Sequence, residues 1–255
     1  MWHYLDAHPD VFMSPEKEPN FFSGVEAPLA PSRLDEESYL RLFRGAAGAR
    51  YRGEASTSYL CSERATDRIH ETSPDARIVV SLRDPVDRIV SAHEFRVLYQ
   101  HEHRSLGDVV DDAEYTGDRY TPNVQRWLEA FPGGVHVLFF EELVANPEGE
   151  MRRLFSFLGL DPTPAVTLDA KVHNPGGEAR NRLSRALLGS RTAHRVARQV
   201  VPARLRSPVM GLLTGRGERQ TAPAYVLERL ADLYREDAVA LERLLGRPTP
   251  WERFS

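Results

Sequence analysis

An arginine and a serine in the first half of the chain have the types and the spacing needed to bind a phosphate group. Arg83 follows the apolar run Ile78–Leu82, and Ser91 lies eight positions after Arg83. Such runs are typical of strands buried on both faces of a parallel sheet, and ligands bind beyond the carboxyl ends of these strands. Arginine supplies a forked pair of donors and serine a short hydroxyl. The alternative is an Arg83–Asp87 ion pair with Ser91 at the surface.

A helix is expected to begin directly after Arg83. Asp84 and Pro85 are residue types that favour an N-cap and a first helical position. The start of this helix should present free backbone N–H groups and the positive end of its dipole to the same anion.

The composition excludes several classes of protein. With 33 basic and 37 acidic residues among 255, the chain has a net charge of −4 and is not a polycation for nucleic acid. Cys61 is the only cysteine, which excludes disulfide frameworks and cysteine-based zinc sites, and no metal is implied. No apolar run approaches the roughly 18–20 residues of a membrane span. The only lysines, Lys17 and Lys171, do not fit the phosphate loop G-x-x-x-x-G-K-[ST].

Strand-like and helix-like segments alternate along the chain. Continuous apolar runs predict strands at residues 11–13, 77–82 and 135–140. Periodic apolar positions with capping residues predict helices near 36–43, 85–99, 121–131, 147–158 and 224–245, and the end of another helix before Pro9. This alternation favours an α/β fold with a parallel sheet. Since no linker forces a break, we expect a single domain over residues 1–255.

A basic segment stands out near the carboxyl end. Residues 180–219 contain ten arginines and one acidic residue. A solvated helical hairpin is the favoured interpretation, and peripheral contact with an acidic membrane surface or an anionic ligand is the alternative. Arg216 and Arg219, in a glycine-rich loop, are the better ligand candidates. No signal peptide is visible, so a cytoplasmic location is expected.

Five short segments together resemble the sulfotransferases that use 3′-phosphoadenosine-5′-phosphosulfate (PAPS). The segment R-D-P-x-x-R with a serine eight residues after the first arginine is similar to their 3′-phosphate-binding strand and helix. The remaining segments resemble the heparan-sulfate and related bacterial branch, in the same order along the chain: H-P-x-V…K-E-x-x-F-F at 8–22, G-E-x-S-x-x-Y at 53–59, and a strand–helix unit at 140–147 and 155–159. The resemblance implies a three-layer, P-loop-NTPase-like parallel sheet flanked by helices.

The resemblance also implies roles for individual residues. Glu18 would be the general base for sulfuryl transfer to a hydroxyl or amine, and Lys17 would hold the sulfate or the acceptor. Arg83 and Ser91 would bind the 3′-phosphate of the donor, and Arg216 and Arg219 would close over the nucleotide. The alternative for Glu18 is a solvated loop carboxylate paired with Lys17.

The acceptor stays open among a small hydroxylated metabolite, a lipid and a saccharide. Members of the heparan-type branch often carry histidine where this chain has Asn20, and lysine where it has Ala55. Both differences disfavour a polysulfated glycan. His93 and Tyr59 are further candidates, although core positions are the more usual role of such residues.

Family members begin with a strand and a P-loop ahead of the segment that Trp2–Leu5 resembles. The resemblance therefore predicts that the first strand and the P-loop are missing from this chain. A start codon assigned too far downstream is the favoured explanation, and a truncated, inactive chain acting as a binding module is the alternative. A P-loop kinase-like nucleotide-binding protein is the second rival, which would need a lysine loop and magnesium carboxylates.

Overall fold

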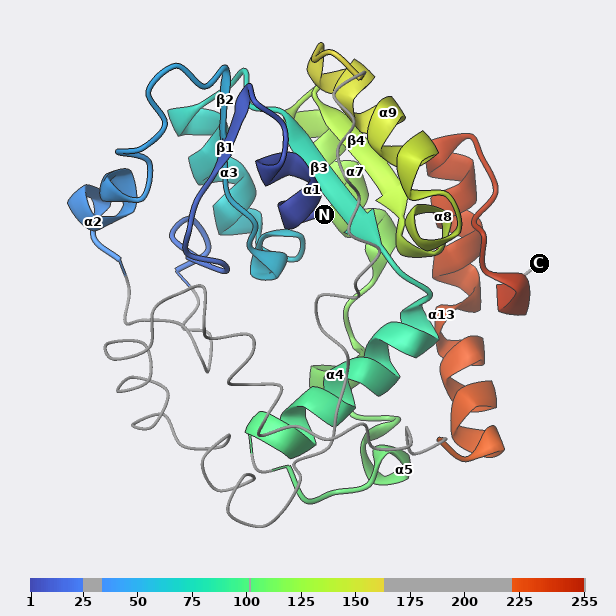
Figure 1. Cartoon of the computed structure of the whole chain (residues 1–255). Coiled ribbons are helices and arrows are strands. Elements are labelled where there is room, and N and C mark those ends of the chain that lie inside the picture. Colours follow the sequence, from blue (N-terminus) through green and yellow to red (C-terminus); the bar gives the residue numbers. More distant parts are fainter. Residues whose placement is uncertain (25–33, 101, 163–221, 255) are drawn as a thin grey trace. The chain divides into compact units, whose positions relative to one another are not determined.

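The computed structural model describes residues 1–24, 34–100, 102–162 and 222–254 (Figure 1). The described residues form two compact units. The first contains residues 1–83, 119–162 and 237–254, and the second contains residues 84–118 and 222–236. The basic segment 180–219, with Arg216 and Arg219, lies outside the described residues.

Two pairs of parallel strands lie in the first unit. β1 (Val11–Met13) pairs with β2 (Tyr51–Gly53), and β3 (Ile78–Leu82) pairs with β4 (Val135–Phe139), as Figure 1 shows. Because paired parallel strands end at the same edge, the segments that follow them start side by side. The expected α/β fold with parallel strands is confirmed.

The expectation that the 77–82 strand is buried on both faces is only partly correct. Val80 and Leu82 are buried, whereas Ser81 between them is exposed. The face that carries Ser81 therefore lies open at this position.

Helices cover the strands of the first unit and form two apolar cores. The helical elements of this unit are α1 (Trp2–Asp6), α2 (Glu36–Arg41), η1 (Thr57–Tyr59), α3 (Glu63–Thr72), α7 (Tyr120–Ala130), α8 (Phe140–Ala145), α9 (Pro147–Leu158), the second half of α13 (Ala224–Leu245) and η2 (Glu252–Phe254). One core joins α1, β1, β4 and α9 through Leu5, Val11, Leu138 and Phe155. The other joins the 21–22 loop, α2, α3 and α7 through residues that include Phe22 and Trp127.

The second unit is helical. It contains α4 (Pro85–Tyr99), α5 (Leu106–Val109), α6 (Ala113–Thr116) and the first half of α13 (Ala224–Leu245). Tyr234 of α13 is almost fully buried and donates a hydrogen bond of 2.9 Å to the carbonyl of Thr116. Arg229 of the same helix pairs with Asp111 at 2.8 Å. None of the described helices is long and apolar enough to span a bilayer.

Candidate active site

The segments that leave β1 and β2 run side by side and bring Glu18 against residues 54–59. The backbone N–H of Ser14 donates to the carbonyl of Gly53 at 2.7 Å, and that of Glu18 donates to the carbonyl of Ala55 at 2.9 Å. These bonds continue the parallel pairing beyond the strands. The carboxyl ends of the two strands therefore position the loop with Lys17 and Glu18, the two residues to which the resemblance gives catalytic roles.

One oxygen of the Glu18 carboxylate is held firmly by Thr57. The backbone N–H of Thr57 donates to Glu18 Oε2 at 2.7 Å, and the Thr57 hydroxyl donates to the same oxygen at 3.1 Å. Burial raises the pKa of Glu18, although the two Thr57 bonds and the neighbouring Lys17 charge oppose this rise. Among the described residues no donor binds Oε1, so this oxygen remains available to accept a proton.

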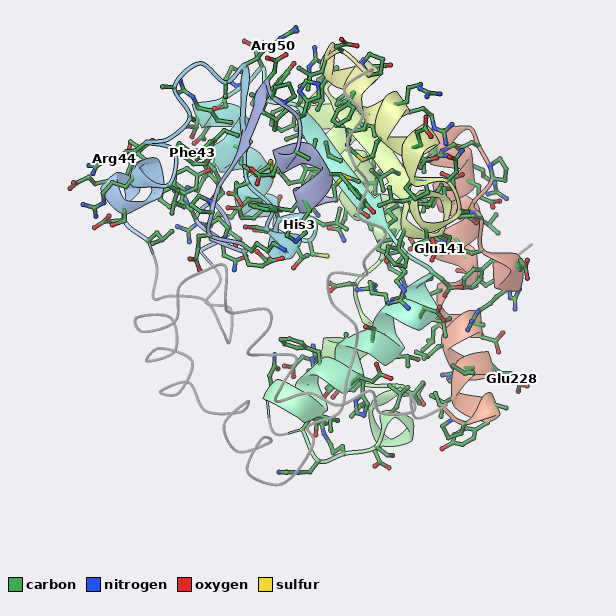
Figure 2. The ribbon with its side chains drawn as sticks, in the orientation of Figure 1. His3, Phe43, Arg44, Arg50, Glu141 and Glu228 are labelled. Atoms are coloured by element: carbon green, nitrogen blue, oxygen red, sulfur yellow. The ribbon has the colours of Figure 1, made fainter. Side chains whose placement is uncertain are left out.

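Lys17 lies beside Glu18 and is in contact with α1. Its Nζ is 3.2 Å from Nε2 of His3 and 5.2 Å from the centre of the Trp2 ring. His3 projects from α1 in Figure 2. Desolvation lowers the pKa of Lys17, and the Glu18 carboxylate opposes the shift. Because Lys17 and Glu18 are neighbours in the sequence, their proximity does not distinguish the catalytic interpretation from the ion-pair interpretation.

A second carboxylate, Glu54, lies near Glu18 and accepts bonds from three hydroxyl groups. Tyr59 donates to Glu54 Oε1 at 2.5 Å, Ser56 donates to Oε2 at 2.7 Å, and Tyr39 donates to Oε1 at 3.4 Å. Burial raises the pKa of Glu54, the bonds from the three hydroxyls oppose this rise, and the charge of Glu18 adds to it. Glu54, Ser56 and Tyr59 belong to the G-E-x-S-x-x-Y segment noticed in the sequence, which assigned no role to Glu54.

Arg68 of α3 holds the aromatic pair that follows Glu18. Its Nη1 donates to the carbonyl of Phe21 at 2.7 Å and to that of Phe22 at 3.0 Å. The guanidinium carbon also lies 4.7 Å from the centre of the Phe21 ring, which stacks on Tyr39 at 4.2 Å. No motif in the sequence points to Arg68, because its partners are backbone carbonyls more than 40 positions away.

Arg83 directly follows β3, belongs to the first unit and is half-buried. Its guanidinium carbon lies 5.5 Å from the centre of the Phe140 ring, and its carbonyl accepts a bond of 2.9 Å from the Tyr120 hydroxyl. Tyr120 is fixed in turn, since its backbone N–H donates to Asp237 at 2.7 Å. The strand end that carries Arg83 is therefore held through both its side chain and its backbone.

Ser91 is half-buried on α4, in the second unit. The predicted free N–H groups at the start of this helix are not found. Pro85 has no N–H, and the Asp84 side chain accepts from Val86 and Asp87 at 2.8 and 3.2 Å. The N–H of Arg88 donates to the carbonyl of Asp84 at 2.8 Å. Asp84 caps the helix completely, so a phosphate at this place would depend on side chains.

His93, the other candidate on α4, is half-buried and lies near Tyr115 of the same unit. Its ring centre lies 6.0 Å from that of Tyr115, and burial lowers its pKa. Within the described part of the chain, no cluster of three or more histidine, cysteine or acidic side chains is arranged to hold a metal ion.

A family model, a solved structure and curated relatives that are similar to this chain are all described as sulfotransferases. The family model described as "Sulfotransferase family" matches residues 3–164. The solved structure of a sulfotransferase from Alicyclobacillus acidocaldarius is 25% identical, with a TM-score of 0.69 over 97% of this chain and 90% of that chain.

Two mouse proteins are also similar. Heparan sulfate glucosamine 3-O-sulfotransferase 6 is 32% identical over 181 residues, which are 62% of this chain and 47% of that protein. Heparan sulfate glucosamine 3-O-sulfotransferase 3B1 is 31% identical over 178 residues, with 62% and 42% covered. The chain thus spans about half the length of the curated relatives it matches. Since the family model covers more than half of the chain, the chain belongs to the sulfotransferase family.

Proposed function

We propose that the chain transfers a sulfuryl group from PAPS to a hydroxyl or amine of an acceptor, with Glu18 as the general base. The observation that carries this proposal is the Glu18 carboxylate itself. Thr57 holds one of its oxygens, burial raises its pKa, and Lys17 lies beside it. A half-buried carboxylate with a raised pKa and one oxygen that Thr57 does not hold suits the role of a proton acceptor.

In the proposed reaction, PAPS supplies an activated sulfuryl group. The acceptor oxygen or nitrogen forms a bond to sulfur while the bond from sulfur to the 5′-phosphate oxygen breaks, and adenosine 3′,5′-bisphosphate leaves. Glu18 Oε1 takes the proton of the acceptor, while Thr57 keeps Oε2 in place. Lys17 Nζ offers a positive charge next to the negative charge that develops on the transferred group.

We assign the 3′-phosphate of the donor to Arg83 and Ser91. Arg83 fits this role because its half-buried guanidinium lies at the carboxyl end of β3, with its backbone fixed by Tyr120. Because Asp84 occupies the first-turn amides of α4, the guanidinium and the Ser91 hydroxyl would carry the binding. Arg216 and Arg219 are proposed to close over the nucleotide.

Arg83→Ala should weaken the binding of adenosine 3′,5′-bisphosphate by about 10- to 100-fold, as expected for losing a charge-assisted bond. Binding of adenosine 5′-monophosphate, which lacks the 3′-phosphate, should change less than about 3-fold. Calorimetry with both nucleotides measures the difference. Arg77→Ala is the matched control, since exposed Arg77 precedes β3 and donates to Gly133 at 3.1 Å. An equal loss for both nucleotides would show that Arg83 does not contact the 3′-phosphate.

A saccharide is the acceptor class that we propose. The support comes from the names of the relatives, which act on glucosamine units of heparan sulfate. Asn20 departs from the heparan-type pattern, and its side chain is turned inward. Its Nδ2 donates to the carbonyl of Glu18 at 2.8 Å, and its Oδ1 accepts from Ser58 at 2.5 Å. Asn20 is therefore a loop-forming residue, and a less sulfated saccharide suits this site better than a highly sulfated one.

Calorimetry with adenosine 3′,5′-bisphosphate and ATP tests the donor class. The proposal predicts that the bisphosphate binds more tightly than ATP. Tighter binding of ATP would favour the kinase-like alternative, and no binding of either nucleotide would favour a non-catalytic module. Mass spectrometry after incubation with PAPS and unsulfated heparosan, heparan sulfate, a simple phenol and a glycolipid then identifies the acceptor by the gain of one SO₃ group.

A further inference from the structure

The loop that carries Glu18 (residues 18–22, called the Glu18 loop below) has a backbone conformation that contacts with other segments must stabilise. Glu18 and Asn20 both have positive φ angles, 55° and 51°. Residues with a side chain rarely adopt this left-handed conformation, which is costly unless surrounding contacts enforce it. The contacts that hold this loop therefore decide where the Glu18 carboxylate points.

Two hydroxyl groups accept backbone N–H groups of this loop. The N–H of Asn20 donates to Ser56 Oγ at 3.1 Å, and the N–H of Phe22 donates to the Tyr59 hydroxyl at 3.2 Å. Asn20 is 4% exposed and Phe22 is 8% exposed. Leaving either N–H without an acceptor at these buried positions would be costly.

The Glu54 carboxylate orients both hydroxyls at once. Ser56 Oγ donates its proton to Glu54 Oε2 at 2.7 Å, and the Tyr59 hydroxyl donates its proton to Oε1 at 2.5 Å. A hydroxyl whose proton points at Glu54 keeps its lone pairs for the loop N–H. Each oxygen of one carboxylate therefore fixes one attachment point of the loop.

We propose that Glu54 is a positioning residue for the general base: as a carboxylate, it holds the Glu18 loop through Ser56 and Tyr59. This inference rests on the proposed function for the role of Glu18, whereas the attachment of the loop is a property of the fold. Glu54 does not contact the reacting atoms in this scheme. Its effect reaches Glu18 through two hydroxyl groups and two backbone N–H groups.

The attachment depends on the ionised form of Glu54. A protonated carboxyl carries one donor of its own, so it cannot accept from both hydroxyls with the same geometry. The groups that face Glu54 are Tyr39 from α2, Tyr59 and Ser56 from the segment after β2, and the nearby charge of Glu18. Burial raises the pKa of Glu54, so its protonation on acidification begins above the usual range of a glutamate.

Three variants test the proposal, with Tyr39→Phe as the matched control for Tyr59→Phe. Both changes remove one hydroxyl that donates to Glu54, but only Tyr59 also holds a backbone N–H of the loop. Glu54→Gln and Tyr59→Phe should increase amide hydrogen exchange of Asn20 and Phe22 by at least about 10-fold. Tyr39→Phe should change this exchange by less than about 2-fold. If Glu54→Gln does not fold, Tyr59→Phe carries the test.

Turnover of PAPS with an oligosaccharide of unsulfated heparosan supplies the second readout. Glu54→Gln should lower kcat by about 10- to 100-fold, because a displaced base loses its near-attack geometry, with KM for PAPS unchanged. At acid pH, log kcat should fall by about two per pH unit in the unaltered chain and by about one in Glu54→Gln, because only Glu18 then titrates. A purely structural role would leave the slope the same in both proteins.

The two readouts separate this inference from the proposed function. Unchanged exchange of Asn20 and Phe22 in both Glu54→Gln and Tyr59→Phe overturns the positioning role, whatever the activity. Faster exchange together with an unchanged kcat and an unchanged acid slope also overturns it. Faster exchange in a chain that transfers no sulfuryl group contradicts the proposed function and reduces Glu54 to a structural support of the loop.

Discussion

Glu18→Gln should lower kcat for sulfuryl transfer by about 10²- to 10⁴-fold, which is the usual contribution of a general base. Glutamine has the same shape, and its amide oxygen can still accept both bonds from Thr57. It cannot accept a proton, however, so the acceptor would have to attack the sulfur atom without help from a base. The variant should keep its affinity for adenosine 3′,5′-bisphosphate and should lose the acid limb of the kcat profile.

Glu16→Gln is the matched control for this experiment. It makes the same change two positions earlier in the same loop, at a residue whose backbone N–H and carbonyl bond to Ser14 Oγ at 3.2 and 2.8 Å. Its kcat should stay within about 2-fold of the unaltered chain. A Glu18→Gln variant with a similarly small loss would remove Glu18 from the proposed mechanism.

Trp251→Ala should lower the free energy of unfolding by about 3–5 kcal/mol, the typical cost of removing a buried tryptophan. Trp251 is 2% exposed, and its ring centre lies 5.3 Å from that of Phe139 and 5.8 Å from that of Tyr120. Its Nε1 donates to Glu141 at 3.1 Å, at the start of α8, where Figure 2 labels Glu141. Thermal and urea unfolding measure the loss.

The same substitution should also alter the position of Arg83 in the proposed donor site. Tyr120 packs on Trp251 and donates to the carbonyl of Arg83, so the cavity left by Trp251→Ala should loosen this strand end. Trp251→Phe is the control that keeps an aromatic ring at this position and removes the bond to Glu141, whose loss costs about 1 kcal/mol. If Trp251→Ala cost no more than Trp251→Phe, packing around Tyr120 would not depend on this side chain.

Much of the fold could be predicted because local signals agree with the final structure. The apolar runs 77–82 and 135–140 correspond to β3 and β4, and the capping pair Asp84-Pro85 begins α4. Asn146 caps α9 by accepting from Gly149, and Gly159 ends that helix with a left-handed φ of 64°. Residue types with strong backbone preferences stand at these boundaries, so neighbouring residues suffice to locate them.

Other elements of the first unit could not be read from the sequence. α3 carries mostly polar and charged side chains, and it is held by a few apolar contacts such as Ile69 and by the capping hydroxyl of Ser62. β2 has only three residues, and it exists because it pairs with β1. Tertiary partners decide both elements, so the periodicity of the sequence gives little indication of them.

Part of the candidate site, like part of the fold, could be predicted from the sequence, and part could not. Lys17 and Glu18 could be selected from the sequence because a resemblance covers their motif. The bonds from the loop to Ser56 and Tyr59, whose hydroxyls Glu54 holds, could not be foreseen, because they depend on how β1 and β2 align. The bonds from Arg68 to the carbonyls of Phe21 and Phe22 could not be foreseen either. The expectation of free N–H groups at the start of α4 was wrong, because the Asp84 N-cap occupies the N–H groups that an anion would need.

Sulfuryl transfer with Glu18 as the base can be measured by following PAPS and a saccharide acceptor over time, with both products quantified in the same samples. Adenosine 3′,5′-bisphosphate and sulfated saccharide should appear in equal amounts, and Glu18→Gln should slow the formation of both equally. Release of the bisphosphate without sulfated saccharide, or equal rates in the unaltered chain and in Glu18→Gln, would show that Glu18 does not serve as the base of a sulfuryl transfer.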